Sequence, residues 1–295
     1  MLEALLKIVA DNRAFWPLTL RQCHYRMLNT GVLKHTGKPH SKYANDKKSY
    51  TDLGDVLVKA RLTGEIPWQA ITDPTRSSNV WGVWPNASPF IAERIKEMFA
   101  GYYRDLLQSQ DFYLEIVVEK LTAETFVSRA AAEFTATYSV TRGYPSIDAR
   151  HEIAVRFRRS GKSHMKLLVV SDYDPEGEDI ARSIVASMRH EFGIADITAY
   201  KVALTAEQVR KYSLPPNNVV KAKSSRAEGF IAANGTHAYE IEALEPAVLQ
   251  SIVSDAIACV IDRPRVDAEV AAEASDAATI LAYDARVKAI LGSPA

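Results

Sequence analysis

The sequence predicts an α/β protein whose larger domain contains a mainly parallel sheet flanked by helices. Between residues 114 and 203, apolar segments alternate with helical segments, a rhythm typical of parallel strands joined by crossover helices. One segment, Leu167–Val170, is apolar throughout, as expected for a strand covered on both faces. The first 62 residues instead show three helical patterns. We therefore expect a smaller domain at 1–105 and the sheet domain at 106–295.

The first domain is predicted to contain three helices followed by a small β element. Its elements are, in order, helices at 2–10, 20–28 and 49–62, a strand at 66–72 and a connecting helix at 89–107. Thr19 and Gln22 form a capping box at the start of the second helix. This order is typical of a winged-helix (CAP-like) DNA-binding domain, whose third helix usually enters a DNA groove.

The second domain is predicted from a repeated strand–helix order. The expected strands are 114–119, 138–141, 167–171 and 197–203, and the expected helices between them are 122–133, 147–159 and 176–191. A loop-rich stretch follows at 209–225. The chain then continues with helices at 246–261 and 267–291, which we interpret as a C-terminal helical extension.

Composition indicates an ordinary soluble protein. Hydrophobic residues make up 47% and charged residues 24% of the chain, and no run of 18 apolar residues is present. The N-terminus carries acids and a helical pattern, unlike a signal peptide. Two cysteines are too few for a disulfide framework or a zinc site. We expect a cytoplasmic protein with no membrane partner.

Charge is unevenly distributed along the chain. The net charge is zero, but residues 1–62 contain 11 Lys or Arg and five Asp or Glu, an excess of +6. This excess favours DNA binding by the first domain, although a solvated, lysine-rich surface would look the same. The candidate DNA-binding residues are Lys42, Lys47, Lys48, Lys59 and Arg61.

Two carboxylates follow the apolar strand directly. Asp172 and Asp174 are two residues apart, so in extended backbone they point to the same side. Asp174 is a suitable N-cap for a helix whose first residue is Pro175. Hard oxygen ligands at the carboxyl end of a strand suit Mg²⁺. The alternative is an acidic strand-to-helix turn with a good cap.

A second apolar strand ends in Glu119, upstream of the Asp-x-Asp strand. This pair of acid-ended strands resembles the Toprim domain of topoisomerases, bacterial primases and several nucleases. In that family the three acids lie together and hold Mg²⁺. The resemblance therefore implies a Mg²⁺ site at Glu119, Asp172 and Asp174.

The predicted second helix contains a tyrosine with an arginine one turn before it. Arg21 and Tyr25 share a helix face, and because arginine is rarely buried unpaired, we expect this face to point toward DNA. A tyrosine that attacks phosphate needs an activating positive neighbour. Arg21 is placed to hold the scissile phosphate bidentately. The alternative is an aromatic core residue beside a surface arginine.

The order of these motifs resembles the A subunit of topoisomerase VI and its meiotic relative Spo11. Three further segments support the resemblance: Gly143-Tyr144-Pro145, Asp172-x-Asp174-Pro175-x-Gly177 and Glu240-Ile241-Glu242-Ala243-Leu244. In that family the second tyrosine of an Arg-Asp-aliphatic-Tyr-Tyr pattern cuts DNA. Tyr25 matches that tyrosine, whereas Gln22 and His24 depart from the pattern, as does Ser146 after Gly-Tyr-Pro.

The resemblance implies Mg²⁺-dependent cleavage of double-stranded DNA by transesterification. Tyr25 would be the nucleophile and Arg21 would stabilise the pentacovalent phosphate. The family acts as a homodimer, and its ATPase domain lies in a separate B subunit, so such a partner is also implied. An alternative is a hydrolytic nuclease, as in the nuclease subunit of the Wadjet plasmid-defence system. Type IA topoisomerases rank lower because they need a longer chain after the Toprim domain. A non-catalytic DNA-binding regulator is the third hypothesis.

Overall fold

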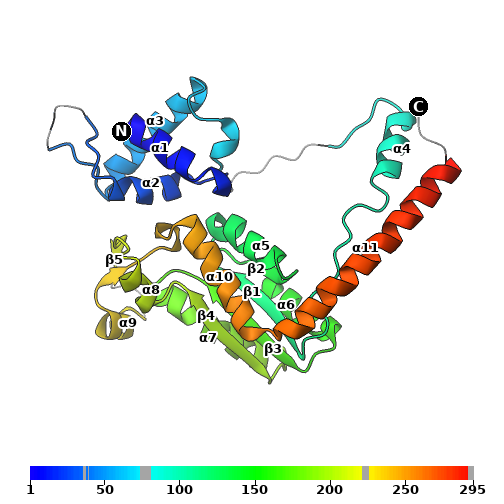
Figure 1. The fold of residues 1–295 in the computed structure, drawn as a ribbon. Helices are drawn as coiled ribbons and strands as arrows, with labels where there is room; N and C mark the ends of the chain where they lie inside the picture. Colours follow the sequence, from blue (N-terminus) through cyan, green and yellow to red (C-terminus); the bar gives the residue numbers. More distant parts are fainter. Residues whose placement is uncertain (36–37, 39, 74–80, 221–225, 292–295) are drawn as a thin grey trace.

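The computed structural model describes the whole chain except residues 36–37, 39, 74–80, 221–225 and 292–295 (Figure 1). A helical N-terminal part lies against a domain built on a sheet, and two helices near the C-terminus and in the connecting segment extend away from both. In the described ranges, no helix is long and apolar enough to cross a membrane.

The sheet has four parallel strands, as the sequence predicts. They are β1 (Phe112–Val118), β2 (Thr137–Val140), β3 (His164–Val170) and β4 (Ile197–Ala203), in the spatial order β2-β1-β3-β4. Val118 pairs with both Val140 and Val170, so the strands end at the same level. The residues that follow them therefore meet at one edge of the sheet, where open α/β sheets bind ligands.

Helices cover both faces of this sheet. One face carries α5 (Glu124–Ala132) and α10 (Pro246–Val260), and the other carries α6 (Ile147–Ser160) and α7 (Pro175–His190). Alternating strand residues supply the two cores. Ile116 and Leu168 belong to one hydrophobic cluster, and Val117 and Val169 belong to the other. This explains why the ends of the two central strands, residues 116–118 and 167–170, are apolar throughout rather than alternating.

The first domain contains the three predicted helices. They are α1 (Leu2–Asp11), α2 (Leu20–Asn29) and α3 (Lys47–Leu62), and a 3₁₀ turn (η1, Arg13–Phe15) follows α1. Thr19 and Gln22 form the predicted capping box. The third helix begins two residues earlier than expected, because the Asp46 side chain accepts the backbone N–H of Ser49 and caps it.

The strand predicted at 66–72 is wrong. The segment forms a 3₁₀ turn (η2, Trp68–Ala70), and only a single bridge joins Ile71 to Leu18. Pro67 lacks the N–H that a strand ladder needs. The Arg61 guanidinium instead donates to the carbonyls of Trp68 and Ile71 and holds the turn on α3.

The connecting helix is shorter than predicted and the C-terminal helix is longer. Helix α4 covers Ala87–Lys96, and residues 97–107 form no further helix. Helix α11 spans Arg263–Leu291, and Arg104 joins the connecting segment to it through Glu269 and Asp276. The sequence did not predict α8 (Ala206–Lys211), α9 (Ala227–Asn234) or the short hairpin of β5 (Asn218–Val219) and β6 (His237–Ala238). The last five residues of the predicted loop 209–225 lie outside the described residues.

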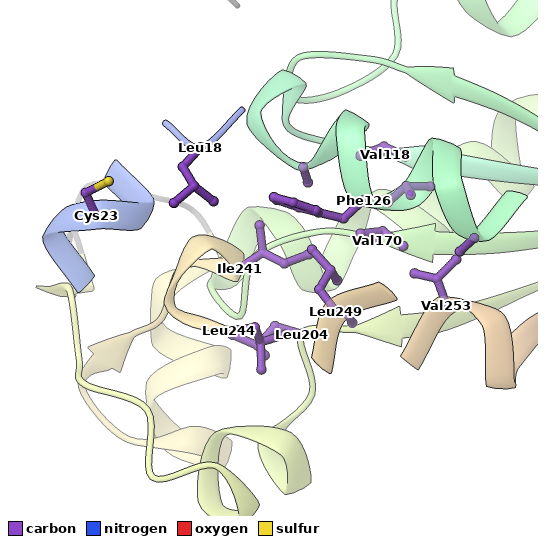
Figure 2. Close-up of a cluster of buried hydrophobic side chains, with 14 of the residues drawn as sticks. Leu18, Cys23, Val118, Phe126, Val170, Leu204, Ile241, Leu244, Leu249 and Val253 are labelled. Atoms are coloured by element: carbon purple, nitrogen blue, oxygen red, sulfur yellow. The ribbon is translucent and has the colours of Figure 1, made fainter. Parts of the chain in front are cut away.

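The two domains share one hydrophobic cluster (Figure 2). Leu18 and Cys23 of the first domain belong to the same buried group as Phe126, Ile241 and Leu244 of the second. Figure 2 shows Leu18 directed toward Phe126 and Ile241. The first domain is therefore docked on the second through apolar contact, which fixes what lies above the sheet edge.

Gly177 sets how closely α7 approaches the end of β3. A Cβ at this position would lie 2.2 Å from the backbone oxygen of Asp172, and a backbone atom cannot rotate away. We expect Gly177→Ala to lower the free energy of unfolding by about 1–3 kcal/mol. The matched control is Gly229→Ala in α9, where nothing lies within 4 Å of the new Cβ. Urea denaturation of both variants is the test, and equal stabilities would contradict the close approach.

Candidate functional site

The three predicted acids meet at the carboxyl edge of the sheet. Glu119 follows β1, and Asp172 and Asp174 follow β3. All three line one cleft of about 590 Å³, together with residues of the Gly143-Tyr144 turn and of α7. We call this cavity the acid cleft. The parallel register that aligns the ends of β1 and β3 brings these side chains together.

Asp174 is the N-cap of α7, as the sequence predicts. Its Oδ1 accepts the backbone N–H of Gly177 at 2.7 Å, and Pro175 occupies the first turn of the helix. This bond uses one carboxylate oxygen. Asp174 is therefore held at the cleft by the helix start itself, which fixes its position without a ligand.

Asp172 is buried and engaged by protein groups on both oxygens. Its Oδ2 lies 2.6 Å from the Lys120 ammonium, and its Oδ1 accepts the backbone N–H of Ile241 at 2.9 Å. Its own backbone N–H donates to Glu119 Oε2 at 3.0 Å. Asp172 thus joins β1, β3 and the segment that precedes α10.

Burial and mutual repulsion make the acids at this edge hard to ionise. Burial raises the pKa of Asp172 to about 7. The ammonium of Lys120 lowers this pKa, and the negative charges of Glu242 and Glu119 raise it. Burial also raises the pKa of Glu119, and the charge of Asp174 adds to this effect. A further positive charge in the cleft would therefore be favourable.

The acid cleft fits Mg²⁺ with two of the three predicted ligands. Among the described residues, no group of three or more Asp, Glu, His or Cys side chains is arranged to hold a metal ion. Both oxygens of Asp172 make other contacts, to Lys120 and to the backbone of Ile241. Mg²⁺ usually takes one or two protein carboxylates and keeps several waters. Glu119 and Asp174 would hold the ion, and Asp172 would contribute charge from behind.

Lys120 is a residue of the acid edge that the sequence did not single out. It lies 2.6 Å from Asp172, 3.2 Å from Glu242 and 3.7 Å from Glu240. The sequence offered a signal, since Lys120 directly follows Glu119 at the end of a strand. Glu240 and Glu242 belong to the Glu-Ile-Glu-Ala-Leu motif, but their position next to Lys120 follows only from the path of the chain.

Lys201 is the second missed residue, and it supports the backbone of the acid strand. Its ammonium donates to the carbonyl oxygen of Asp172 at 2.6 Å and pairs with Glu178 at 2.7 Å. Burial lowers its pKa. A lysine within the apolar strand β4 was the available signal.

Tyr25 was predicted to face outward, toward DNA, but it is buried. Its side chain is only 2% exposed, and its hydroxyl donates to Glu240 Oε2 at 3.0 Å. Arg21 pairs with the same oxygen and is partly exposed. Burial and the Glu240 charge raise the pKa of Tyr25 well above its usual value. The Arg21–Tyr25 face therefore packs on the second domain of the same chain.

A second cavity, of about 310 Å³, lies between the domains beside Tyr25. Its lining comes from both domains: Arg21, His24, Tyr25, Asn45, Asp46, Lys47, Tyr50, Asn217 and Glu240. We call it the interdomain pocket. Glu240 and Asn217 also line the acid cleft, so the two cavities adjoin.

The candidate DNA-binding residues separate into two kinds. Lys42, Lys47, Lys48 and Lys59 are exposed. Arg61 is partly buried, donates to two carbonyls of η2 and has its guanidinium 4.3 Å from the Trp68 ring centre. Arg61 therefore has a structural use, whereas the four lysines lie on the surface.

In comparisons with known proteins, the chain matches no protein-family model and no curated protein sequence.

Because Lys120 compensates the buried carboxylate of Asp172, we expect Lys120→Met to lower the stability of the protein more at high pH than at low pH. Because the folded-state pKa of Asp172 is about 7, the folded protein holds this proton more tightly than the unfolded chain, whose carboxyl has a pKa near 4. The stability that the proton provides is complete below about pH 4 and is lost as the pH rises through about 7. Lys120→Met removes the compensating cation. We expect a loss of about 3 kcal/mol or more at pH 8 and a clearly smaller loss at pH 5.

This prediction is checked by urea denaturation in EDTA at both pH values. Lys96→Met, on the exposed helix α4, is the control for removing a lysine charge and should have little effect. Equal losses for Lys120→Met at pH 5 and pH 8 would show that Asp172 does not titrate between them.

Proposed function

We propose that this protein cleaves DNA by Mg²⁺-dependent hydrolysis in the acid cleft, with a winged-helix-like first domain and a Toprim-like second domain. The observation that carries the proposal is the position of Glu119 and Asp174, which line one cleft at the aligned ends of two parallel strands. Carboxylates placed in this way suit a hard divalent cation.

The chain's own residues would prepare the cleft for a phosphate. Glu119 and Asp174 would hold Mg²⁺, which when bound offsets phosphate charge and supports the attacking or leaving oxygen. Lys120 compensates the buried Asp172, and Lys201 holds the backbone beneath it. Arg142 and Arg21 line a neighbouring cavity that also contains Glu119, so cations stand beside the acids.

Water is favoured over Tyr25 as the nucleophile. The Tyr25 hydroxyl is buried and its pKa is raised, so the phenolate that attacks phosphorus is costly to form. Its bonding partner, Glu240, belongs to the same chain.

Transesterification by Tyr25 is the second candidate, and one contact favours it. The Tyr25 hydroxyl donates a hydrogen bond to Glu240 Oε2 at 3.0 Å, within the reach of a general base, and Arg21 pairs with the same oxygen. Although burial opposes it, Lys120 and Arg21 lower the pKa of Glu240, which weakens it as a base. We rank this candidate below hydrolysis for that reason.

The partners proposed with this function are double-stranded DNA and a second copy of the chain. A symmetric dimer would place two acid clefts on the two strands of a duplex. A separate ATPase subunit is part of the same proposal. The DNA-binding regulator remains a third candidate, in which the acids are structural and cleavage is absent.

Two substitutions separate the candidates. Asp174→Asn keeps a side-chain acceptor for the α7 cap, so the fold should remain, but it removes a ligand charge. We expect cleavage of duplex DNA to fall by more than the roughly 10–100-fold that loss of an outer-shell partner costs.

Tyr25→Phe should retain cleavage activity within about threefold if water attacks the phosphate, since the phenol hydroxyl makes no phosphate contact in that mechanism.

The readout is gel analysis of labelled duplex DNA with Mg²⁺, with and without protease treatment. Tyr43→Phe, which removes another buried hydroxyl, bonded to His24, is the control for lost stability. Protein attached to the cut 5′ end in the parent, and loss of cutting in Tyr25→Phe alone, would overturn hydrolysis in favour of transesterification. Full cutting in EDTA would overturn both.

The two kinds of basic residue should respond differently to substitution. Lys59→Ala should reduce the salt dependence of DNA binding by about one phosphate contact and leave stability unchanged. Arg61→Ala should lower the free energy of unfolding by about 1–3 kcal/mol, because two carbonyl partners and the Trp68 stacking are lost. Fluorescence anisotropy at several salt concentrations and urea denaturation give the two readouts. An unchanged salt slope for Lys59→Ala would remove Lys59 from the interface.

A further inference from the structure

The interdomain pocket has the composition of a nucleotide site. Its volume of about 310 Å³ is at the lower end of the range for small-molecule pockets. Its wall combines two cations, one aromatic ring with a partly open surface and two side-chain amides, on Arg21, Lys47, Tyr50, Asn45 and Asn217. Two carboxylates, Asp46 and Glu240, also line the pocket; Asp46 accepts the backbone N–H of Ser49 and Glu240 is paired with Arg21. Cations recognise phosphate, aromatic faces stack on bases, and amides bond to base edges.

Lys47 supplies a cation that is available to an anion. In the described part of the chain, Lys47 forms no ion pair, and it is exposed at the start of α3. Arg21 uses Nη1 for Glu240, which leaves other N–H donors of the guanidinium for a second oxygen. The two side chains thus offer a point charge and a fork on the same wall.

Tyr50 supplies an aromatic surface whose position is already fixed. Its ring lies 5.2 Å from the His24 ring in an edge-to-face contact, and the Arg21 guanidinium lies 5.8 Å from its centre. The Tyr50 side chain is partly exposed to solvent. Because these contacts order the ring without a ligand, stacking a base on it costs little side-chain entropy.

A chain of hydrogen bonds beside the pocket runs from the first domain to the second. His24 bonds to the Tyr43 hydroxyl at 2.6 Å and to Asn45 Oδ1 at 3.1 Å, and Asn45 Nδ2 donates to the carbonyl of Pro216 at 2.8 Å. Burial lowers the pKa of His24, so the ring is neutral and donates through one nitrogen only. His24 thereby fixes which way the Asn45 amide points.

We propose that the interdomain pocket binds one nucleotide, with its phosphate on Lys47 and Arg21 and its base stacked on Tyr50. This inference rests on the proposed function, because a nucleotide here would adjoin the acid cleft through Glu240 and Asn217. In a DNA substrate it would be an unpaired nucleotide next to the cleaved phosphodiester. A free mononucleotide has the same chemistry.

Binding is tested with the full chain in EDTA, where cleavage does not interfere. Isothermal titration with deoxyadenosine monophosphate should show binding, whereas deoxyadenosine and inorganic phosphate alone should each bind at least about tenfold more weakly. Tyr50→Leu should weaken binding of the monophosphate at least about fivefold, and Tyr50→Phe should keep it. Lys47→Ala should weaken it at least about tenfold.

Matched controls exclude nonspecific effects. Lys7→Ala removes the same charge from another exposed site of the first domain, and Tyr103→Ala removes an exposed tyrosine from the segment between α4 and β1. Neither should change binding. Thermal melting of Tyr50→Leu against Tyr50→Phe confirms that a lost signal comes from lost stacking in a folded protein.

A second arm identifies the source of the nucleotide. Duplex DNA with one unpaired nucleotide should bind more tightly than fully paired DNA in the parent and equally in Tyr50→Leu. If the monophosphate binds through Tyr50 and Lys47 but the two duplexes bind alike, the ligand is a free nucleotide. If neither the monophosphate nor the unpaired duplex depends on Tyr50, the proposal is overturned, even where Mg²⁺-dependent cleavage is intact. Nucleotide binding without any DNA cleavage would instead remove only the proposed function.

Discussion

The site depends on one partly buried ammonium group, that of Lys120. Lys120 lies within 4 Å of Asp172, Glu240 and Glu242, at an edge of the sheet where Glu119 and Asp174 add two further carboxylates. Buried charges are costly unless they are paired, and an acid cluster without a cation would raise its own pKa values until it became neutral. Lys120 limits this effect without removing it, as the raised pKa of Asp172 shows. The resulting excess of negative charge is what makes the acid cleft attractive to a divalent cation or to a cationic group of a partner.

Glu240 connects the acids around Lys120 to the first domain. One of its oxygens bonds to Tyr25 and Arg21, and the other lies near Lys120. The first domain is therefore positioned by polar contacts to the acid edge as well as by the shared apolar cluster around Leu18 and Phe126. Any ligand that competes for Arg21 would alter both the domain contact and the charge balance around Lys120. The acid cleft and the interdomain pocket are thus electrostatically connected.

The acids that carry the resemblance to the topoisomerase VI A subunit line one cleft, but their arrangement differs in part from the expected one. Glu119 and Asp174 line the cleft, and Asp174 caps α7 as predicted. Asp172 is turned toward Lys120 and the backbone of Ile241. Tyr25 was expected at a DNA-facing surface because of its arginine neighbour. The arginine finds its partner in Glu240, more than 200 positions later in the chain, and spacing along a helix carries no information about such a contact.

The sequence by itself determined the parallel strands, the crossover helices, the caps at Thr19 and Asp174 and the gathering of acids at one sheet edge. These features follow from local rules: apolar runs, helical periodicity, capping side chains and the common direction of parallel strands. Only the tertiary structure decided the burial of Tyr25, the structural use of Arg61 and the placement of Lys120 among the acids. Each of these depends on segments distant in sequence that become neighbours when the first domain docks on the second and when the segment before α10 returns to the sheet edge. A charged or polar side chain that loses water on folding must pair with a group of opposite charge or with a hydrogen-bond partner. The path of the folded chain decides which such group lies near it.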